Sequence, residues 1–137
     1  MTMHAPIYSA FYAALLGLLG VLLTARVIVL RGRFQVAEGD GGQAPLRQAI
    51  RAHCNFTEQT PLALLLIVLA EGLGAVPLVI HVLGVLLLLA RLASAWQLSR
   101  TLGPGALRGV GAATTLIATL AAAVVVLYRV AVAISLR

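Results

Sequence analysis

Four long runs of apolar residues constrain this chain more than any other feature of its sequence. Each run is longer than the roughly 20 residues that a helix needs to cross about 30 Å of hydrocarbon. Hydrophobic residues make up 61% of the 137 residues and charged residues only 10%, whereas soluble domains carry about 25% charged residues. The sequence therefore predicts an all-α membrane protein, a single-domain four-transmembrane-helix bundle. The predicted spans cover about residues 6–30, 46–73, 78–101 and 107–135.

Polar breaks between the runs predict the connections and their orientation. Residues 31–45 form a polar loop, Gly72, Gly74 and Pro77 form a turn, and Gly103–Gly105 ends the third run. The first and third connections hold or border most of the arginines, and positive charge stays on the cytoplasmic side of a membrane. We therefore predict that these two connections face the cytoplasm and that both termini lie outside.

The basic residues are all arginines, and with four acidic residues they give a net charge of +6. They are spread along the chain, and no basic stripe alternates with aromatic residues. A nucleic-acid partner is therefore not predicted, and no metal site is predicted either. Membrane orientation and an anionic ligand explain the charge better.

A polar stripe on the second run is the strongest functional signal. Arg51, Asn55 and Glu58 follow one another at i, i+4 and i+7, which places them on one face of a helix. Arg47 extends this stripe by one turn, and His53 lies beside it. A charge at the bilayer centre costs roughly 2.5–3.5 kcal/mol even on the lenient insertion scale. The stripe is therefore expected to face the bundle and to have partners.

Cations on the other runs are the available partners. Arg26 and Arg91 lie at a similar depth, Ser94 shares the face of Arg91, and Arg100 and Arg108 stand at the cytoplasmic edge. Together with the stripe, these residues predict a pocket open to the cytoplasm, with several positive charges and one deep carboxylate. Such a pocket suits a ligand with carboxylates and an amine, because arginine forks clamp carboxylates and a carboxylate pairs with the amine.

A purely structural interpretation remains open for the same residues. Arg51 and Glu58 would then belong to a buried ion-pair network that fixes the register of the helices without any ligand. Outside the stripe, Glu71 lies near the outer end of the second run and is expected to reach lipid headgroups. Trp96 is expected to be a packing or interface aromatic.

The segment Arg51-Ala-His-x-Asn55-x-x-Glu58-x-x-Pro61 resembles the second-helix signature of the MAPEG family, the membrane-associated proteins of eicosanoid and glutathione metabolism. The likeness continues in Ala25-Arg26 and in Ala90-Arg91-Leu92, and the order of four short spans agrees over nearly the whole chain. The loop segment from Phe34 to Gly42 looks like a bacterial branch of the family.

This resemblance implies a homotrimer that binds glutathione between neighbouring subunits near the cytoplasmic side. Residues matching Arg51, Asn55 and Glu58 hold the tripeptide, and an arginine matching Arg26 comes from the adjacent subunit. An arginine near the start of the fourth helix, for which Arg108 is the nearest match, stabilises the thiolate. The implied activity is that of a glutathione-dependent transferase or peroxidase in a bacterial inner membrane, acting on lipophilic electrophiles or lipid hydroperoxides.

The sequence also departs from the family pattern. Eicosanoid-type members carry an aromatic or histidine at the positions of Ser94 and Leu98, one group has tyrosine where Gln59 stands, and one member has a catalytic serine where Gly109 stands. Binding is therefore better supported than catalysis. Arg108 and Arg100 are the predicted thiol-activating residues. The predicted glutathione-binding residues are Arg26, Arg51, His53, Asn55, Glu58, Gln59, Arg91 and Ser94.

Two other functions remain as alternatives. The first is a non-catalytic trimer that binds another anionic amphiphile or serves as a membrane scaffold, which the missing aromatics favour. The second is a small four-span exporter. It is disfavoured because such proteins typically rely on an acid in their first helix, and the first run here has none.

Overall fold

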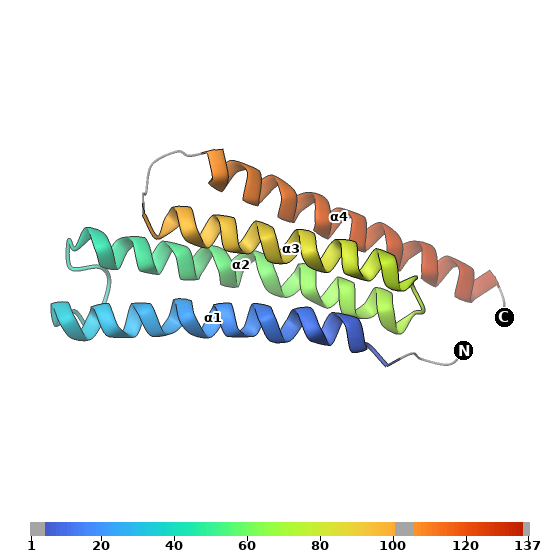
Figure 1. Cartoon of the computed structure of the whole chain (residues 1–137), viewed down its shortest axis with the longest axis horizontal. Coiled ribbons are helices and arrows are strands. Elements are labelled where there is room, and N and C mark those ends of the chain that lie inside the picture. Colours follow the sequence, from blue (N-terminus) through green and yellow to red (C-terminus); the bar gives the residue numbers. More distant parts are fainter. Residues whose placement is uncertain (1–4, 101–105, 136–137) are drawn as a thin grey trace.

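Four long helices make up the protein. The computed structural model describes residues 5–100 and 106–135, with the backbone alone at 106–108. Its elements are α1 (Ile7–Phe34), α2 (Ala44–Gly72), α3 (Pro77–Leu98) and α4 (Ala106–Ser135), and the described residues include no strand. The helices lie side by side along the long axis of the molecule (Figure 1). This arrangement confirms the all-α bundle.

Two helix ends differ from the predicted spans. Helix α1 continues to Phe34, four residues into the segment predicted as a loop, and ends where Gln35 adopts a left-handed conformation with φ of 55°. Helix α3 ends at Leu98, short of the predicted residue 101. Apolar character marks the part of a helix that lies in lipid, whereas the backbone continues until a local conformation stops it.

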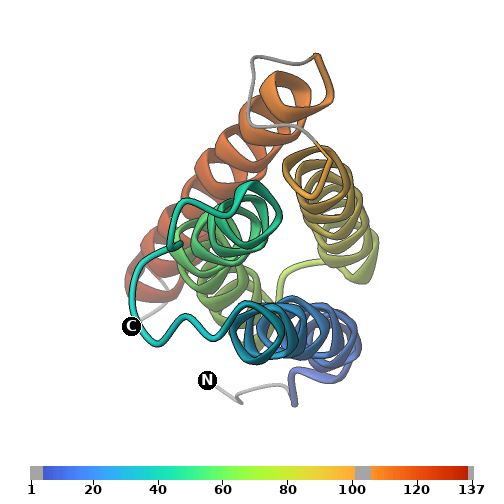
Figure 2. The ribbon, with the colours of Figure 1, turned by 90° about the vertical axis from the view of Figure 1, so that its left-hand side faces the viewer.

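Three of the four helices are long and apolar enough to cross a membrane, namely α1, α3 and residues 109–135 of α4. Helix α2 is of similar length, with 29 residues, but the polar first half that carries Arg51 and Glu58 keeps it outside this group. It contacts all three other helices, whereas α1 and α4 make no contact within the described residues. The end-on view shows α2 between α1 and α4 (Figure 2). Helix α3 also contacts all three others, so the least apolar helix is one of the two that pack against every other helix.

Apolar side chains from all four helices form the main core. Large apolar residues outside it, such as Leu22 of α1, Leu89 of α3 and Leu127 of α4, are exposed on the surface of the chain. Exposed leucines of this kind suit a surface in contact with lipid. The core consists of Leu16, Ala63, Ile67, Ala70, Ile80, Leu83, Leu87 and Ala122.

A glycine allows α1 and α3 to approach closely. A Cβ atom on Gly84 would lie 2.3 Å from Cδ2 of Tyr12. The Tyr12 hydroxyl also shares a hydrogen bond of 2.9 Å with Nδ1 of His81, one turn earlier on α3. The position of the Tyr12 side chain therefore depends on the absence of a side chain at Gly84 and on the hydrogen bond to the His81 imidazole.

The start of α1 is capped by a residue from α2. The N-cap position, Pro6, makes no side-chain cap. Instead, the carboxylate of Glu71 accepts the backbone N–H groups of Tyr8 at 2.9 Å and Ser9 at 2.7 Å. Glu71 is 5% exposed, so the prediction that it reaches lipid headgroups was wrong. A carboxylate at a helix N-terminus satisfies free N–H groups and interacts favourably with the helix dipole.

The α1–α2 connection lies at one end of the bundle, where α3 also ends and α4 begins, and the α2–α3 turn lies at the other end (Figure 1). Within the first connection, Arg31 donates to the carbonyl oxygens of Val36 and Ala37. The carboxylate of Asp40 accepts the N–H of Gly42 and pairs with the Arg47 guanidinium. The hydrogen bond from Arg47 holds the pKa of Asp40 below its usual value. Arg47, which was predicted to extend the polar stripe, therefore forms an ion pair with Asp40 of the loop.

Candidate functional site

The polar stripe of α2 divides between the inside and the outside of the chain. Asn55 is half-buried and turned toward α3, whereas Arg51 and Glu58 are exposed. Among the described residues, the only ion pair joins Arg47 and Asp40. The ion-pair network considered for Arg51 and Glu58 is therefore not formed within the described part of one chain. Both charges remain available to a ligand or to a second subunit.

The guanidinium of Arg91 joins three helices. It is 1% exposed, and its Nη1 donates to Oδ1 of Asn55 on α2 at 3.1 Å. Its Nη2 donates to the Gly111 carbonyl oxygen at 3.1 Å and to Oγ1 of Thr115, both on α4. The Ser94 hydroxyl accepts a longer bond of 3.4 Å from the same nitrogen. Arg91 and Ser94 therefore lie inside the bundle, where they tie α2 and α4 to α3.

A glycine on α4 makes this network possible. A Cβ atom on Gly111 would lie 2.2 Å from the Ser94 hydroxyl oxygen and 2.8 Å from the Ala90 carbonyl oxygen. The absence of a side chain brings the backbone of α4 against α3. The Gly111 carbonyl oxygen can then accept from both Arg91 and Thr115.

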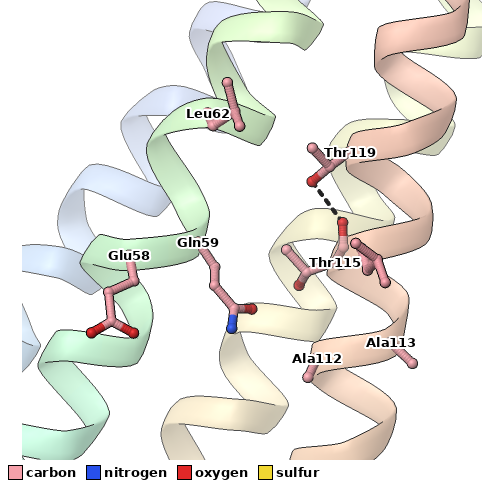
Figure 3. A pocket seen from close by; sticks show the side chains of 8 residues that line it. Glu58, Gln59, Leu62, Ala112, Ala113, Thr115 and Thr119 are labelled. Atoms are coloured by element: carbon pink, nitrogen blue, oxygen red, sulfur yellow. Dashed lines mark hydrogen bonds between the residues drawn. The ribbon is translucent and has the colours of Figure 1, made fainter.

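A groove of about 480 Å³ lies between α2 and α4. Glu58 and Gln59 contribute polar groups from α2, and the Gln59 amide extends into the space between the helices (Figure 3). The Glu58 carboxylate lies on the other side of Gln59 from α4. Thr115, which Arg91 holds, belongs to the opposite wall. The remaining lining residues are Leu62, Ala112, Ala113, Leu116 and Thr119.

A second groove, of about 410 Å³, lies between α1 and α3. It contains Arg26, whose Nη2 donates to the Ser99 carbonyl oxygen at 3.0 Å. It also contains Arg100, whose guanidinium carbon lies 4.1 Å from the centre of the Trp96 ring. These two arginines, predicted to share one pocket with the α2 stripe, lie within one chain on a different groove.

Most of the predicted site residues thus fall into three places: the α2–α4 groove, the internal network and the α1–α3 groove. Arg51 is exposed on α2 and lines neither groove. His53 is half-buried on α2 and lines none of these grooves. Arg108 lies in the first turn of α4, one turn before Ala112, and its side chain is outside the described residues.

Apart from Arg108, the sequence reasoning missed the contribution of α4. Thr115 and Thr119 line the α2–α4 groove, and Thr115 is also part of the Arg91 network. Their signal was a pair of threonines at i and i+4 in a largely apolar helix, a spacing that puts both on one face.

Comparison with known proteins agrees with this architecture. The chain is similar to inner membrane protein YecN of Escherichia coli K12, with 42% identity over 84 residues. The protein of the same name from Escherichia coli O6:H1 matches equally well. The aligned part covers 61% of this chain and 64% of each relative. The sequence profile of the MAPEG family matches residues 9–128, which includes nearly all of the four helices, and the chain therefore belongs to the MAPEG family.

Proposed function

We propose that this protein is a glutathione-dependent transferase or peroxidase of a bacterial inner membrane, acting on lipophilic electrophiles or lipid hydroperoxides. The observation that carries the proposal is the α2–α4 groove, which is lined by Glu58 and Gln59 beside apolar residues of both helices. Family membership and the name of the Escherichia coli relative support the proposal at the level of a membrane protein of this family.

The charges on α2 match the groups of glutathione. Arg51 and Glu58 are two turns apart on an exposed face, and neither has a partner among the described residues. Glutathione has two carboxylates and one amine. Arg51 binds a carboxylate through its fork of N–H donors, and Glu58 accepts the ammonium group. Gln59 offers both a donor and an acceptor to the peptide backbone of the ligand.

A homotrimer would complete this site. Charges that face lipid are costly, so the exposed face with Arg51 and Glu58 favours coverage by a second subunit. The resemblance to glutathione-binding members assigns Arg26 of a neighbouring subunit to the ligand. Arg26 lies on the α1–α3 side of the chain, away from the α2–α4 groove, so it can reach such a ligand only across a subunit boundary.

Thiol activation is assigned to Arg108 rather than to Arg100. Arg108 lies one turn before Ala112, a lining residue of the α2–α4 groove, whereas Arg100 stacks on Trp96 at the other groove. A cation near the sulfur favours thiolate over thiol.

In a transferase step, the thiolate sulfur bonds to the electrophilic carbon while a leaving group departs with its electron pair, or while the π bond of a conjugated acceptor breaks and a proton from water is added. In a peroxidase step, the thiolate attacks the hydroperoxide, the O–O bond breaks and the alcohol leaves after protonation. A second glutathione then converts the resulting sulfenic acid to glutathione disulfide and water. Leu62 and Leu116, both exposed and both lining the groove, leave it accessible to substrates dissolved in the bilayer.

Calorimetry of the detergent-solubilised protein with glutathione tests the binding step. We expect Arg51→Gln and Glu58→Gln each to lower the affinity by at least about tenfold, because each removes a charge-assisted hydrogen bond. Arg33→Gln, which removes an exposed arginine at the far end of α1, is the matched control and should bind normally. If the intact protein gives no heat with glutathione, the proposal is wrong.

Ultraviolet absorbance of the bound thiolate tests the activation step. The intact protein should show this absorbance with glutathione, and Arg108→Ala should remove it while binding persists. Arg100→Ala should retain it. The opposite result for the two variants would assign the activation to Arg100.

The burial of Ser94 and Leu98 favours a second candidate, a non-catalytic trimer that binds another anionic amphiphile. These residues stand where enzymes of the eicosanoid type carry aromatics, and here they are 3% and 1% exposed. They offer no group to the thiol end of a ligand in the α2–α4 groove. Thermal shift measurements against thiols, lipids and acidic metabolites separate the two functions, since stabilisation by a non-thiol compound alone favours the second.

A further inference from the structure

The α1–α3 groove differs in its charge from the α2–α4 groove of the proposed glutathione site. Among the described residues, its two charged lining residues, Arg26 and Arg100, are both cations, and no acidic residue lines it. This contrasts with the α2–α4 groove, where Glu58 is the charged lining residue. The α1–α3 groove therefore favours an anionic occupant.

Both arginines keep donors for such an occupant. Within the described residues, Arg26 uses Nη2 for the Ser99 carbonyl oxygen. Arg100 places its guanidinium carbon over the Trp96 ring, 4.1 Å from the ring centre. Stacking of this kind leaves the in-plane N–H groups of an arginine free to donate. A phosphate group takes several such bonds at once, because it presents multiple acceptor oxygens.

The rest of the groove is apolar. Leu19 and Leu23 of α1 face Leu92 and Ala95 of α3 across it. The arginines belong to the end of the groove at which α1 and α3 finish, since Arg26 lies in the last third of α1 and Arg100 follows the end of α3. Trp96 is 58% exposed beside them, and tryptophan is enriched at the level of lipid headgroups. A cationic end and an apolar body match a molecule with an anionic head and a hydrocarbon chain.

We propose that the α1–α3 groove binds an anionic phospholipid, with its phosphate between Arg26 and Arg100 and an acyl chain along Leu23 and Leu92. Basic pockets between transmembrane helices on the cytoplasmic side hold lipid headgroups in this way. The proposal goes beyond the glutathione function and does not depend on it. The role that the family resemblance gives Arg26 in a neighbouring subunit is a separate prediction, so the main test uses Arg100.

The single tryptophan of the chain allows a direct test, because Trp96 lines the groove itself. The full-length protein is reconstituted into phosphatidylcholine vesicles that contain a minor amount of lipid with brominated chains, which quench tryptophan on contact. We expect brominated phosphatidylglycerol to quench Trp96 more strongly than brominated phosphatidylcholine at the same content. The readout is the ratio of the affinities for the two lipids, each obtained from the fraction of Trp96 fluorescence that is quenched. A substitution that changes the intensity of Trp96 emission alters both measurements equally and leaves this ratio unchanged.

Matched variants assign this preference to the groove. Arg100→Gln and Arg26→Gln should each lower the ratio about fivefold, the effect of losing one arginine near an anionic lipid. Arg33→Gln removes an exposed arginine near the same end of the bundle but outside the groove, and it should leave the ratio unchanged. Unchanged circular dichroism of the variants confirms that they fold.

Four outcomes would overturn the proposal. Equal quenching by the two brominated lipids would show that the headgroup is not recognised. An effect of Arg33→Gln as large as that of Arg100→Gln would indicate general surface charge instead of a site. Loss of the preference on adding inorganic phosphate at constant ionic strength would indicate a site for soluble phosphate. No quenching by either lipid would show that protein, such as a second copy of the chain, covers the groove.

Discussion

Arg91 on α3 holds α2 and α4 in place through its hydrogen bonds. Its guanidinium is buried, and no acidic residue neutralises it among its described partners, which are the side chains of Asn55, Ser94 and Thr115 and two backbone carbonyl oxygens. Neutral acceptors compensate a buried cation only when several of them converge on it. The network therefore fixes the relative positions of α2, α3 and α4, and with them the wall of the α2–α4 groove.

Replacing Arg91 tests this role. We expect Arg91→Met to lower the free energy of unfolding by about 2–4 kcal/mol, because it leaves several buried acceptors without a donor. Arg91→Lys should recover only part of this loss, since one ammonium cannot span α2 and α4 in the same way. Reversible unfolding in mixed detergent micelles measures both. Arg33→Met is the control, and a loss as large as that of Arg91→Met would contradict the network.

The sequence predicted which residues share the stripe but not which side of it meets protein. The spacing of Arg51, Asn55 and Glu58 fixes their common face, because helix geometry is local. Whether that face meets α3, α4 or the outside depends on how the helices pack. Asn55 sits near one edge of the stripe and turns toward Arg91, while the two charged residues stay outside. Likewise, nothing in the local sequence separates Arg26 and Arg100 from the other predicted ligands.

At the scale of elements, close contacts between helices depend on single glycines. The apolar runs predicted the number and order of the helices, because length and hydropathy are properties of each segment alone. They did not predict where α1 and α3 touch. That contact depends on Gly84 facing the ring of Tyr12, two residues that lie 72 positions apart in the sequence.

A methyl group at this contact should be costly. We expect Gly84→Ala to lower the free energy of unfolding by about 1–3 kcal/mol, the usual effect of overpacking a filled contact. Gly17→Ala is the matched control, because a Cβ atom there meets nothing within 4 Å. Tyr12→Ala in the Gly84→Ala background should cost less than the sum of the two single changes. Additive effects in this cycle would show that the tyrosine ring is not what excludes the methyl group.

The loop between α1 and α2 should respond to acid. The pKa of Asp40 is lowered mainly by its hydrogen bond from Arg47, so the bond contributes to the folded state above pH about 4. This contribution is lost as the pH falls through the lowered pKa. Hydrogen exchange of the loop amides, corrected for intrinsic rates, should therefore accelerate in that range. Asp40→Asn should abolish the pH dependence, whereas Glu38→Gln should preserve it.

At the scale of the whole molecule, the two ends of the bundle differ in charge. The end at which α1 and α3 finish carries Arg31, Arg33 and Arg100, whereas the α2–α3 turn from residue 73 to residue 76 has no charged residue. Since positive loops stay in the cytoplasm, the arginine-rich end is predicted to face inward. This orientation would place the arginines of the α1–α3 groove in the leaflet nearer the cytoplasm.

Cysteine labelling tests this orientation. Cys54 is the only cysteine, so Cys54→Ala provides a background without thiols. In that background, Glu38→Cys should react with a membrane-impermeant maleimide only after the cells are permeabilised. Val76→Cys, in the exposed turn at the other end, should react in intact spheroplasts. The reverse pattern would invert the bundle and place both grooves on the opposite side of the membrane.

The cap that Glu71 provides has a consequence for how the chain is made. Helix α1 is synthesised first, but the two amide groups at its beginning find their acceptor only after more than sixty further residues have been added. Until then they must remain hydrated or bind lipid headgroups. The first turn of α1 therefore completes its hydrogen bonds only when α1 and α2 pack together as a hairpin. In a nascent chain that ends before residue 71, the backbone N–H groups in the first turn of α1 would not yet have the carboxylate that accepts them.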